Sequence, residues 1–276
     1  MLKAEIVAIG SELLTPYRSD TNSLWLTERL NSVGIEVMLK TLVGDDEPRL
    51  EEALKDALRR SDVVVSTGGL GPTEDDITRK VFARVTGRQL ILDYEVLAEI
   101  RRRFESRGYH MTPNNERQAL IPNGAEVLPN PNGTAPGIKI NHEGKLFVVL
   151  PGPPREMKPM FEDYVIPDLE KMSRGVRIFT RTLKVSGLGE SAMDDLIAPI
   201  YREYSNPTTT ILFTDSELEI HLTARAETFE RAENLVDELT DKLADKLGDN
   251  LYSTNGESLE KVIGERLVLK RYTIAT

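Results

Sequence analysis

Glycines and carboxylates lie side by side in one short stretch of the chain, GGLGPTEDDIT at residues 68–78. Consecutive glycines let backbone N–H groups turn toward a bound anion such as a phosphate. Glu74, Asp75 and Asp76 would repel that anion unless a divalent cation lay between them, and carboxylate oxygens are the ligands that such a cation takes. The stretch therefore predicts a phosphate site with a metal ion beside it.

Some residues near this stretch also have a purely structural interpretation. The glycines alone fit a ligand-free turn equally well, because they match neither the Walker phosphate loop nor the dinucleotide-binding glycine motif. Asp45 follows an apolar run in LVGDDEP, and we expect it to join Asp75 and Asp76 as metal ligands and catalytic residues. Its neighbour Asp46 could merely cap the next helix.

Polar residues after the first apolar run lead to a similar choice. Glu12, Asp20 and Asn22 could reach the bound ligand or the metal ion, and Asp20 could equally cap a helix. Thr78 could be a hydroxyl contact or an ordinary first-turn residue. Two turn-rich segments, NPNGTAPG at 130–137 and LPGPPREM at 150–157, are expected to line the same pocket.

Short apolar runs alternate with amphipathic helices through the first part of the chain. Strand-like runs at 4–9, 35–43 and 63–65 precede helical patterns at 22–33, 48–58 and 77–85, and a buried strand follows at 145–150. This order predicts a three-layer α/β/α sandwich with a mostly parallel sheet. Ligands of such sheets bind at the carboxyl ends of the strands, which is where the glycine stretch and Asp45 fall.

The pattern changes after residue 172. The first domain is expected to cover residues 1–172 and to end in a helix over 156–172. A polar–apolar alternating strand from residue 176 and a long charged helix at 229–247 predict a small α+β domain over 173–254. Residues 255–276 begin as a helix and finish in the strand-like run RYTIAT.

Composition excludes several classes of site and partner. The formal net charge of −10 argues against binding a nucleic-acid backbone. The chain has no Cys, so disulfides, thiolate nucleophiles and Cys-ligated metals are excluded. With neither a secretory signal nor an apolar run of membrane-spanning length, the sequence predicts a cytoplasmic protein without a membrane partner.

Six motifs in order give the chain a specific resemblance. They are SELL with DTN at 11–22, VGDD at 43–46, the glycine stretch, NERQ at 115–118 within the pattern NxxQ, NPNGTAPG and LPGPPREM. This set resembles the CinA family, whose first domain is similar to the MoaB/MogA-type molybdopterin-binding domain and whose middle domain is KH-like. Nucleic-acid binding through that middle domain is not expected, because GLGE at 187–190 departs from the GXXG clamp with basic flanks and is followed by Asp194 and Asp195.

The resemblance implies a metal-dependent ADP-ribose pyrophosphatase that gives AMP and ribose 5-phosphate, uses Mg²⁺ or Co²⁺, with K⁺ as a further candidate, and forms a homodimer. The resemblance and the site interpretation together predict as substrate-binding residues Glu12, Asp20, Asn22, Gly68, Gly69, Leu70, Gly71, Thr73, Thr78, Asn115, Gln118, Asn132, Gly133, Thr134, Pro151, Gly152 and Pro153. Complete family members usually add an amidase domain that deamidates nicotinamide mononucleotide. Residues 255–276 resemble its start, so we expect no such activity from this chain.

Two other functions stay open. The first is a molybdopterin adenylyltransferase, whose adenylyl-transfer loop resembles GGTGxxxRDxTPE. At the matching positions this chain has Asp75 in place of the Arg, Arg79 in place of the Pro and Lys80 in place of the Glu. The change to Asp75 makes the loop more acidic, which favours a cation over an anionic pterin and so favours pyrophosphate hydrolysis. The other alternative is a non-catalytic nucleotide sensor or scaffold linked to competence.

Overall fold

The computed structural model describes residues 2–173, 175–214 and 217–272, which fall into two compact units, 1–174 and 175–276. Each unit is described by itself. The strands of the first unit are β1 (Lys3–Ile9), β2 (Glu36–Val43), β3 (Val63–Thr67), β4 (Leu90–Leu92), β5 (Leu120–Pro122), β6 (Glu126–Leu128), β7 (Gly137–His142) and β8 (Lys145–Leu150). Its α-helices are α1 (Thr21–Ser32), α2 (Glu47–Arg60), α3 (Thr78–Val85), α4 (Tyr94–Ser106), α5 (Pro154–Met160) and α6 (Ile166–Met172), and short 3₁₀ helices cover Ser11–Leu14 and Pro113–Ala119.

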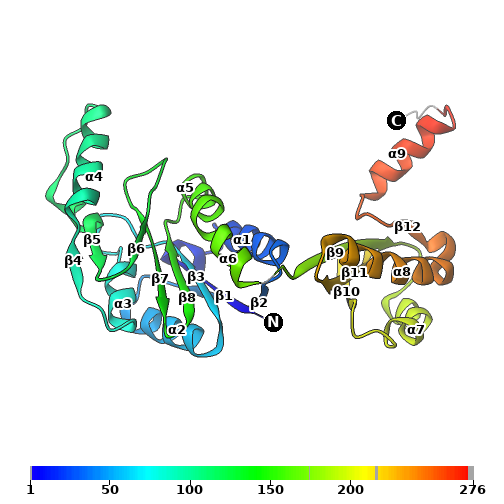
Figure 1. Cartoon of the computed structure of the whole chain (residues 1–276). Coiled ribbons are helices and arrows are strands. Elements are labelled where there is room, and N and C mark those ends of the chain that lie inside the picture. Colours follow the sequence, from blue (N-terminus) through cyan, green and yellow to red (C-terminus); the bar gives the residue numbers. More distant parts are fainter. Residues whose placement is uncertain (1, 174, 215–216, 273–276) are drawn as a thin grey trace. The chain divides into compact units, whose positions relative to one another are not determined.

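A six-stranded sheet in the order β2-β1-β3-β8-β7-β6 forms the centre of the first unit (Figure 1). Strands β2, β1, β3 and β8 run parallel, while β7 and β6 are antiparallel to their neighbours. The register pairs Ile9 with Val43 and Thr67 with Leu150, so the parallel strands end at one common edge. The mostly parallel α/β/α sandwich that the sequence predicts is therefore confirmed.

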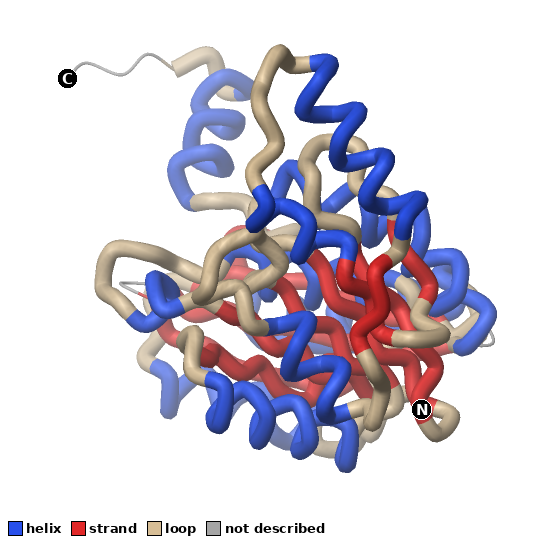
Figure 2. Tube along the Cα trace, turned by 90° about the vertical axis from the view of Figure 1, so that its left-hand side faces the viewer, coloured by secondary structure: helices blue, strands red, loops and turns tan. Residues whose placement is uncertain are grey.

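Both faces of this sheet are covered by helices, and the strands lie between helical layers (Figure 2). Alternate residues of β1 point to opposite faces, as strand geometry requires. Val7 and Ile9 belong to the cluster that includes α2, α3 and α4, and Ala4 and Ile6 belong to the cluster that includes α1, α5 and α6. Helices thus pack on both faces of the sheet, and the loops gather at the edge where the parallel strands end.

The helix expected over 156–172 is interrupted. α5 ends at Met160, a π-helical turn covers Phe161–Val165, and α6 follows. Pro159 and Pro167 fall on either side of that turn, and proline cannot donate a backbone hydrogen bond inside a helix. The segment Pro113–Ala119 is a 3₁₀ helix, which also begins at a proline.

A buried ion pair joins β1 to the end of α2. Glu5 is 0% exposed, and its two carboxylate oxygens accept from Arg60 at 2.7 and 2.8 Å. Thr41 Oγ1 lies 3.1 Å from the same carboxylate. The charge of Glu5 is therefore compensated inside the sheet edge rather than by water.

We expect Arg60→Met to lower the free energy of unfolding by about 3 kcal/mol, because it leaves the buried Glu5 carboxylate without its cation. Arg59→Met is the matched control, since the Arg59 side chain is 76% exposed and pairs with Asp56, whose side chain is 40% exposed. Urea unfolding followed by Trp25 fluorescence measures both variants, since Trp25 packs against Phe161 in this unit. Equal losses of unfolding free energy in the two variants would show that the buried pair stabilises the fold no more than an exposed one.

The second unit is a small antiparallel α+β fold. Its elements are β9 (Arg177–Val185), α7 (Glu190–Tyr201), β10 (Thr208–Thr214), β11 (Glu217–Ala226), α8 (Phe229–Leu247), a 3₁₀ turn over Gly248–Asn250, β12 (Leu251–Ser253) and α9 (Leu259–Leu269). The sheet order is β10-β11-β9-β12, and α7 and α8 supply apolar side chains to a core on one face. The strand predicted over 271–276 falls mostly outside the described residues.

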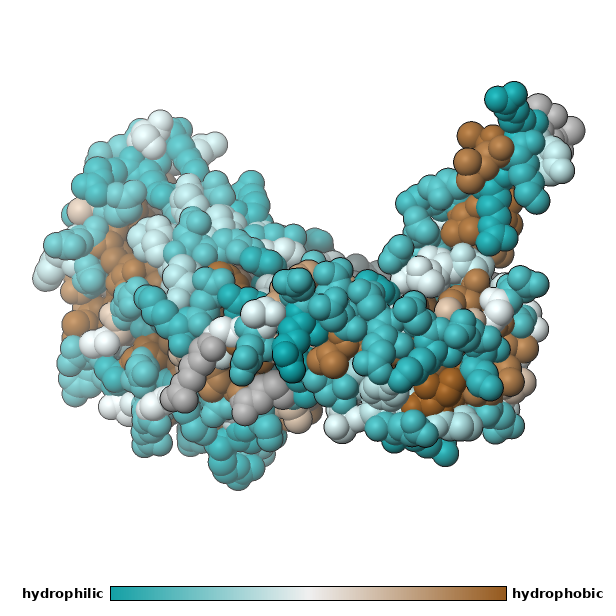
Figure 3. Space-filling model, turned by 45° about the vertical axis from the view of Figure 1, so that its right-hand side comes forward, coloured by the Kyte–Doolittle hydropathy of each residue, from teal (hydrophilic) through white to brown (hydrophobic). Residues whose placement is uncertain are grey.

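The surface drawn in Figure 3 is largely hydrophilic, with apolar side chains showing along α9. Three of them, Ile263, Val268 and Leu269, are 46%, 77% and 82% exposed. Within the part of the chain that the structure describes, no helix is long and apolar enough to cross a membrane.

Candidate functional site

Loops from four parallel strands converge at the common edge of the sheet. Each follows the last residue of a strand: Ile9, Val43, Thr67 or Leu150. Together with the 132–135 and 153–156 segments they enclose a cavity of about 520 Å³. The edge at which ligands bind open α/β sheets therefore carries a real pocket here.

The glycine loop begins with a backbone approach that only glycine allows. Gly68 has φ +110°, and a Cβ added to it would lie 2.0 Å from the carbonyl oxygen of Ile9. Its N–H donates to the Leu150 carbonyl at 2.9 Å, which ties the loop to β8. Thr78 supports the loop from beneath, with its hydroxyl donating to the Gly68 carbonyl at 2.9 Å.

Asp76 organises the rest of this loop. One carboxylate oxygen accepts from the Gly71 N–H at 2.7 Å. The other accepts from the N–H and the hydroxyl of Thr73 at 2.8 and 2.7 Å. The backbone donors that the sequence assigns to a phosphate are thus held by a carboxylate of the chain itself.

A buried cation holds the opposite side of the same peptides. Arg79, 5% exposed, donates from its guanidinium to the carbonyl oxygens of Leu70 and Gly71. Burial lowers the pKa of Arg79 to about 10, against a smaller opposing effect of the Asp76 charge. Leu70 and Gly71 are therefore fixed from both sides, by Arg79 through their carbonyls and by Asp76 through the Gly71 N–H.

Asp45 is fixed by a reciprocal pair of hydrogen bonds. The Ser11 N–H donates to an Asp45 carboxylate oxygen at 2.9 Å, and the Asp45 N–H donates to the Ser11 hydroxyl at 3.0 Å. Asp46, by contrast, caps α2 by accepting from the Arg49 N–H at 3.0 Å. The two neighbours therefore have different roles, and only Asp45 lines the cavity.

The 130–137 segment is shaped by Asn130, which is 5% exposed. Its side-chain oxygen accepts from the N–H groups of Asn132 and Gly133, and its amide donates to the Ala135 carbonyl and to Glu156, both at 2.8 Å. Glu156 is 9% exposed and lines the cavity. The turn chemistry of this segment thus places a further carboxylate at the site.

A second cavity of about 360 Å³ shares Ile9, Glu12, Gly152 and Pro153 with the first. Asp20 caps α1 by accepting from the Ser23 N–H at 3.0 Å and also lines this second cavity. The Asn22 amide donates to the Gly152 carbonyl at 2.7 Å and to Thr67 Oγ1 at 3.2 Å, while its oxygen is buried without a partner among the described residues.

The structure brings most of the predicted residues to these two cavities. The first is lined by Glu12, Asp45, Gly68, Gly69, Leu70, Gly71, Thr73, Asp75, Asp76, Gln118, Asn132, Gly133, Thr134, Pro151, Gly152 and Pro153, and the second by Asp20 and Asn22. Two predicted residues lie elsewhere. Thr78 is buried under the glycine loop, and the Asn115 side chain accepts from the Thr112 N–H and hydroxyl in a capping box at the start of a 3₁₀ helix.

Three charged residues of the first cavity were not named individually as site residues from the sequence: Arg107, Arg155 and Glu156. The last two stand in LPGPPREM, where their charges beside a rigid turn were a usable signal, whereas nothing in the sequence around Arg107 marks it. Carboxylates outnumber guanidinium groups around this cavity, the five being Glu12, Asp45, Asp75, Asp76 and Glu156. Among the described residues, however, no group of three or more His, Asp or Glu is placed to hold a metal ion.

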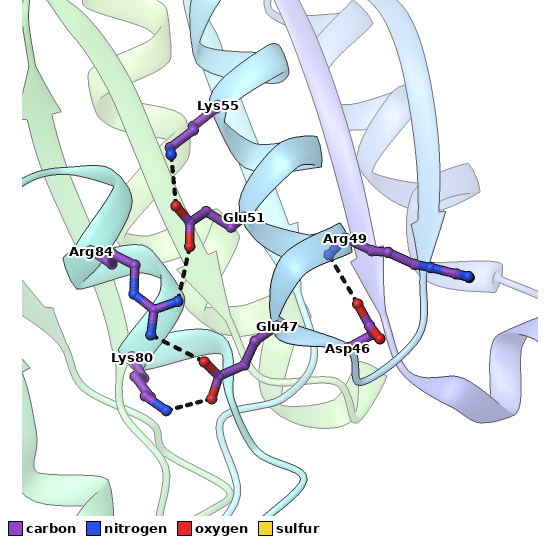
Figure 4. A network of polar contacts seen from close by, with 7 residues as sticks. All are labelled: Asp46, Glu47, Arg49, Glu51, Lys55, Lys80 and Arg84. Carbon is purple, nitrogen blue, oxygen red and sulfur yellow. Dashed lines mark hydrogen bonds and ion pairs between the residues drawn. The ribbon is translucent and has the colours of Figure 1, made fainter.

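Charged residues on the two helices behind the site pair with one another (Figure 4). Glu47 at the start of α2 accepts from Lys80 and Arg84 of α3, and Glu51 accepts from Lys55 and Arg84. The hydrogen bond from Lys80, and then the one from Arg84, hold the pKa of Glu47 below its usual value. These cations are thus neutralised between α2 and α3.

The lowered pKa of Glu47 gives a pH dependence with a definite sign. Its contribution to stability should be present above its unfolded-state pKa of 4.5 and be lost as the pH falls through the lower folded-state pKa. The difference in urea midpoint between wild type and Glu47→Gln should therefore shrink in acid. Glu52→Gln on the same helix removes an exposed carboxylate and is the control. A difference that grows below pH 4.5 would contradict the assignment.

Comparison with known proteins agrees with both units. The family described as "Probable molybdopterin binding domain" matches residues 5–171, and the one described as "Damage-inducible protein CinA KH domain" matches residues 180–253. A solved CinA of unknown function from Thermoplasma acidophilum is 35% identical with a TM-score of 0.56, covering 60% of this chain and 98% of that one.

Curated relatives extend the match over nearly the whole chain. A CinA-like protein of Solibacter usitatus is 47% identical over 263 residues, which are 95% of this chain and 63% of that protein. A CinA-like protein of Koribacter versatilis is 47% identical over 276 residues, which are 99% of this chain and 67% of that protein. The chain thus spans 63% and 67% of the length of these relatives. On the motifs, the two matched domains and these relatives, the chain belongs to the family of CinA-like proteins.

Proposed function

We propose that the chain hydrolyses the diphosphate bond of ADP-ribose, giving AMP and ribose 5-phosphate. The observation that carries this proposal is the pair of adjacent cavities, about 520 and 360 Å³, which share Ile9, Glu12, Gly152 and Pro153 in their linings. ADP-ribose has two sugar-bearing halves joined by a diphosphate, so each cavity can take one half. Water adds to one phosphorus, the bridging P–O bond breaks, and the bridging oxygen leaves with the other phosphate.

The side chains around the cavities suit this ligand. The guanidinium groups of Arg107 and Arg155 at the larger cavity can pair with phosphate oxygens. In the smaller cavity, the carboxylate of Asp20 is an acceptor for ribose hydroxyls.

A divalent ion fits this site as a companion of the substrate rather than as a resident cofactor. The described residues form no dedicated three-ligand group, but Mg²⁺ is commonly held by one or two carboxylates, waters and substrate phosphates. Asp45, Asp75 and Asp76 line the larger cavity, and one or two of them would hold Mg²⁺ or Co²⁺ there together with waters and the phosphates of the substrate. Such an ion would neutralise the diphosphate and make a bound water more acidic, and K⁺ would supply charge compensation alone.

In this scheme the chain's own residues orient and shield the reactants. Ser11 keeps the Asp45 carboxylate turned toward the cavity, and Asn130 does the same for Glu156. The Gly152 backbone lines both cavities, and a Cβ added to it would lie 3.5 Å from the Gly68 Cα, so these two glycine backbones pack closely where the cavities share their lining.

The test is a substrate panel with product analysis. Purified chain is incubated with ADP-ribose, ADP-glucose or NADH and with Mg²⁺, Co²⁺ or EDTA, and the nucleotides are separated by chromatography. We expect AMP from ADP-ribose with a divalent ion and none with EDTA. Intact ADP-ribose under every condition would refute the proposal.

A second candidate function is adenylyl transfer to a pterin, which is favoured by the match of residues 5–171 to a molybdopterin binding domain. That activity would consume ATP only when molybdopterin is present. A third, non-catalytic role as a nucleotide sensor or scaffold linked to competence would show tight ADP-ribose binding without AMP. The same panel, extended by ATP with molybdopterin, separates the three.

Partners and location follow from the same proposal. We propose a cytoplasmic homodimer that binds a small nucleotide and no nucleic acid. The relatives are longer than this chain, and we propose that nicotinamide mononucleotide deamidation needs the part of those proteins that this chain does not match. Size-exclusion chromatography with light scattering tests the dimer, and added nicotinamide mononucleotide tests the deamidase.

A further inference from the structure

The glycine loop contains a set of donors that already holds an anion. The N–H groups of Gly71 and Thr73 and the Thr73 hydroxyl converge on the Asp76 carboxylate at 2.7 to 2.8 Å. A phosphate presents oxygens of the same kind to such donors, and backbone concavities of this kind are common phosphate sites. A side chain at Gly71 would fill this space, since its Cβ would lie 2.5 Å from an Asp76 oxygen.

A buried positive charge lies behind these donors. Arg79 is 5% exposed and donates to two backbone carbonyls, and within the described residues no carboxylate forms a direct ion pair with it. A buried, unpaired cation is costly unless an anion lies close by. The Asp76 charge acts on Arg79 and offsets part of that cost. If Asp76 moved away, another anion would have to take its place.

The same donors are open to a ligand. Gly71, Thr73 and Asp76 all line the larger cavity, and Thr73 is exposed. An anion entering the cavity can therefore reach the position of the Asp76 carboxylate without unfolding the loop. The loop itself is held by contacts that do not involve Asp76, through Arg79 and through Thr78 to the Gly68 carbonyl.

We propose that the position now taken by the Asp76 carboxylate is the subsite for one phosphate of the ligand, and that this phosphate enters by displacing Asp76. The proposal rests on the proposed function only for the choice of a diphosphate as ligand. The released carboxylate then faces the cavity, where it can meet a cation that arrives with the diphosphate. Asp76 thereby opposes diphosphate binding when no cation is present and supports it when one is.

The test compares two single charge removals in EDTA. Isothermal titration calorimetry measures the binding of inorganic pyrophosphate to wild type, Asp76→Asn and Asp75→Asn. Pyrophosphate carries the phosphates without the nucleoside, so the result does not depend on ADP-ribose being the substrate. Asp75 is the matched control because it is the exposed neighbour that lines the same cavity and bonds to none of the three donors.

We expect Asp76→Asn to bind pyrophosphate about tenfold more tightly than wild type, and Asp75→Asn to change the affinity less than about twofold. Equal effects, weaker binding by Asp76→Asn or no detectable binding by that variant would overturn the proposal. Should Asp76→Asn fail to fold, a crystal structure of wild type soaked with pyrophosphate decides the question. A phosphate oxygen within hydrogen-bond distance of the Gly71 and Thr73 N–H groups supports it, and Asp76 still in that position with ligand bound refutes it.

Turnover separates this proposal from the proposed function. If Asp76→Asn binds pyrophosphate more tightly but wild type does not hydrolyse ADP-ribose, the phosphate subsite is supported and the proposed hydrolase function is refuted. If wild type hydrolyses ADP-ribose but Asp76→Asn and Asp75→Asn have the same pyrophosphate affinity, the hydrolase function is supported and the phosphate subsite is refuted.

Discussion

Asp45→Asn should lower kcat for ADP-ribose hydrolysis by about a thousandfold while leaving the stability of the chain unchanged. The Asp45 carboxylate lines the larger cavity, and its orientation is fixed by the N–H of Ser11 at 2.9 Å. An amide keeps that hydrogen bond through its oxygen but lacks the charge that a divalent ion and its water require. Because the ion acts mainly on the transition state, the loss should appear in kcat rather than in KM.

Asp46→Asn is the matched control for this prediction. Asp46 caps α2 and does not line the cavity, and Asn caps a helix about as well as Asp. Steady-state kinetics with Mg²⁺ and a thermal melt of each variant make the comparison. Equal kcat values for the two variants would show that Asp45 has no role in hydrolysis. A lower melting temperature for Asp45→Asn alone would indicate a structural role instead.

Gly68→Ala should lower the free energy of unfolding by about 3 kcal/mol and shift the glycine loop. Two costs add at this position. The φ of +110° is one that side-chain-bearing residues rarely adopt, and the new Cβ would lie 2.0 Å from the backbone oxygen of Ile9, which cannot rotate away. Relief would need β1 and β3 to separate at the edge where the cavity lies, so activity should fall as well.

Gly87→Ala separates these two costs. Gly87 has φ +66° but nothing within 4 Å of its Cβ position, so it should lose only about 1 kcal/mol. Urea unfolding followed by Trp25 fluorescence gives both values on the same unit. Equal losses at the two positions would mean that the contact with Ile9 relaxes freely.

The sequence predicts the sheet and its edge well because the signals are local. Apolar β-branched runs such as 63–65 and helical spacing over 48–58 locate the elements, and parallel strands then bring their following loops together. Asp45 and the glycine stretch could therefore be assigned to one pocket without any knowledge of coordinates. The continuous helix over 156–172 could not be excluded, because whether a proline interrupts a helix depends on how the surrounding core packs.

Roles within the site were harder to predict than membership of it. Thr78 and Asn115 both have side chains that could contact a ligand, yet each satisfies backbone groups of its own segment. Nothing local indicates that Asp76 reaches back to Gly71, or that Arg79 turns inward beneath Leu70. Those contacts depend on the exact path of the loop, which is set by Gly68 passing close to Ile9.

The hydrogen bonds of Asp76 also change how the acidic loop is expected to bind phosphate and metal. From the sequence, its carboxylates suggested a ready metal site beside a free phosphate cradle. In the structure the cradle holds Asp76, and the described residues contain no three-ligand group. Phosphate and cation are therefore expected to bind together, because the phosphate displaces the Asp76 carboxylate and the displaced carboxylate can then bind the cation.

Phosphorus-31 NMR of one reaction tests the central claim most directly. The chain is mixed with ADP-ribose and Mg²⁺ or Co²⁺, and the diphosphate signals are followed over time. We predict that they disappear while two phosphomonoester signals, those of AMP and ribose 5-phosphate, grow in equal amounts, and that EDTA stops the change. Diphosphate signals that persist with either ion would contradict the assignment of this pocket as a dinucleotide diphosphate hydrolase.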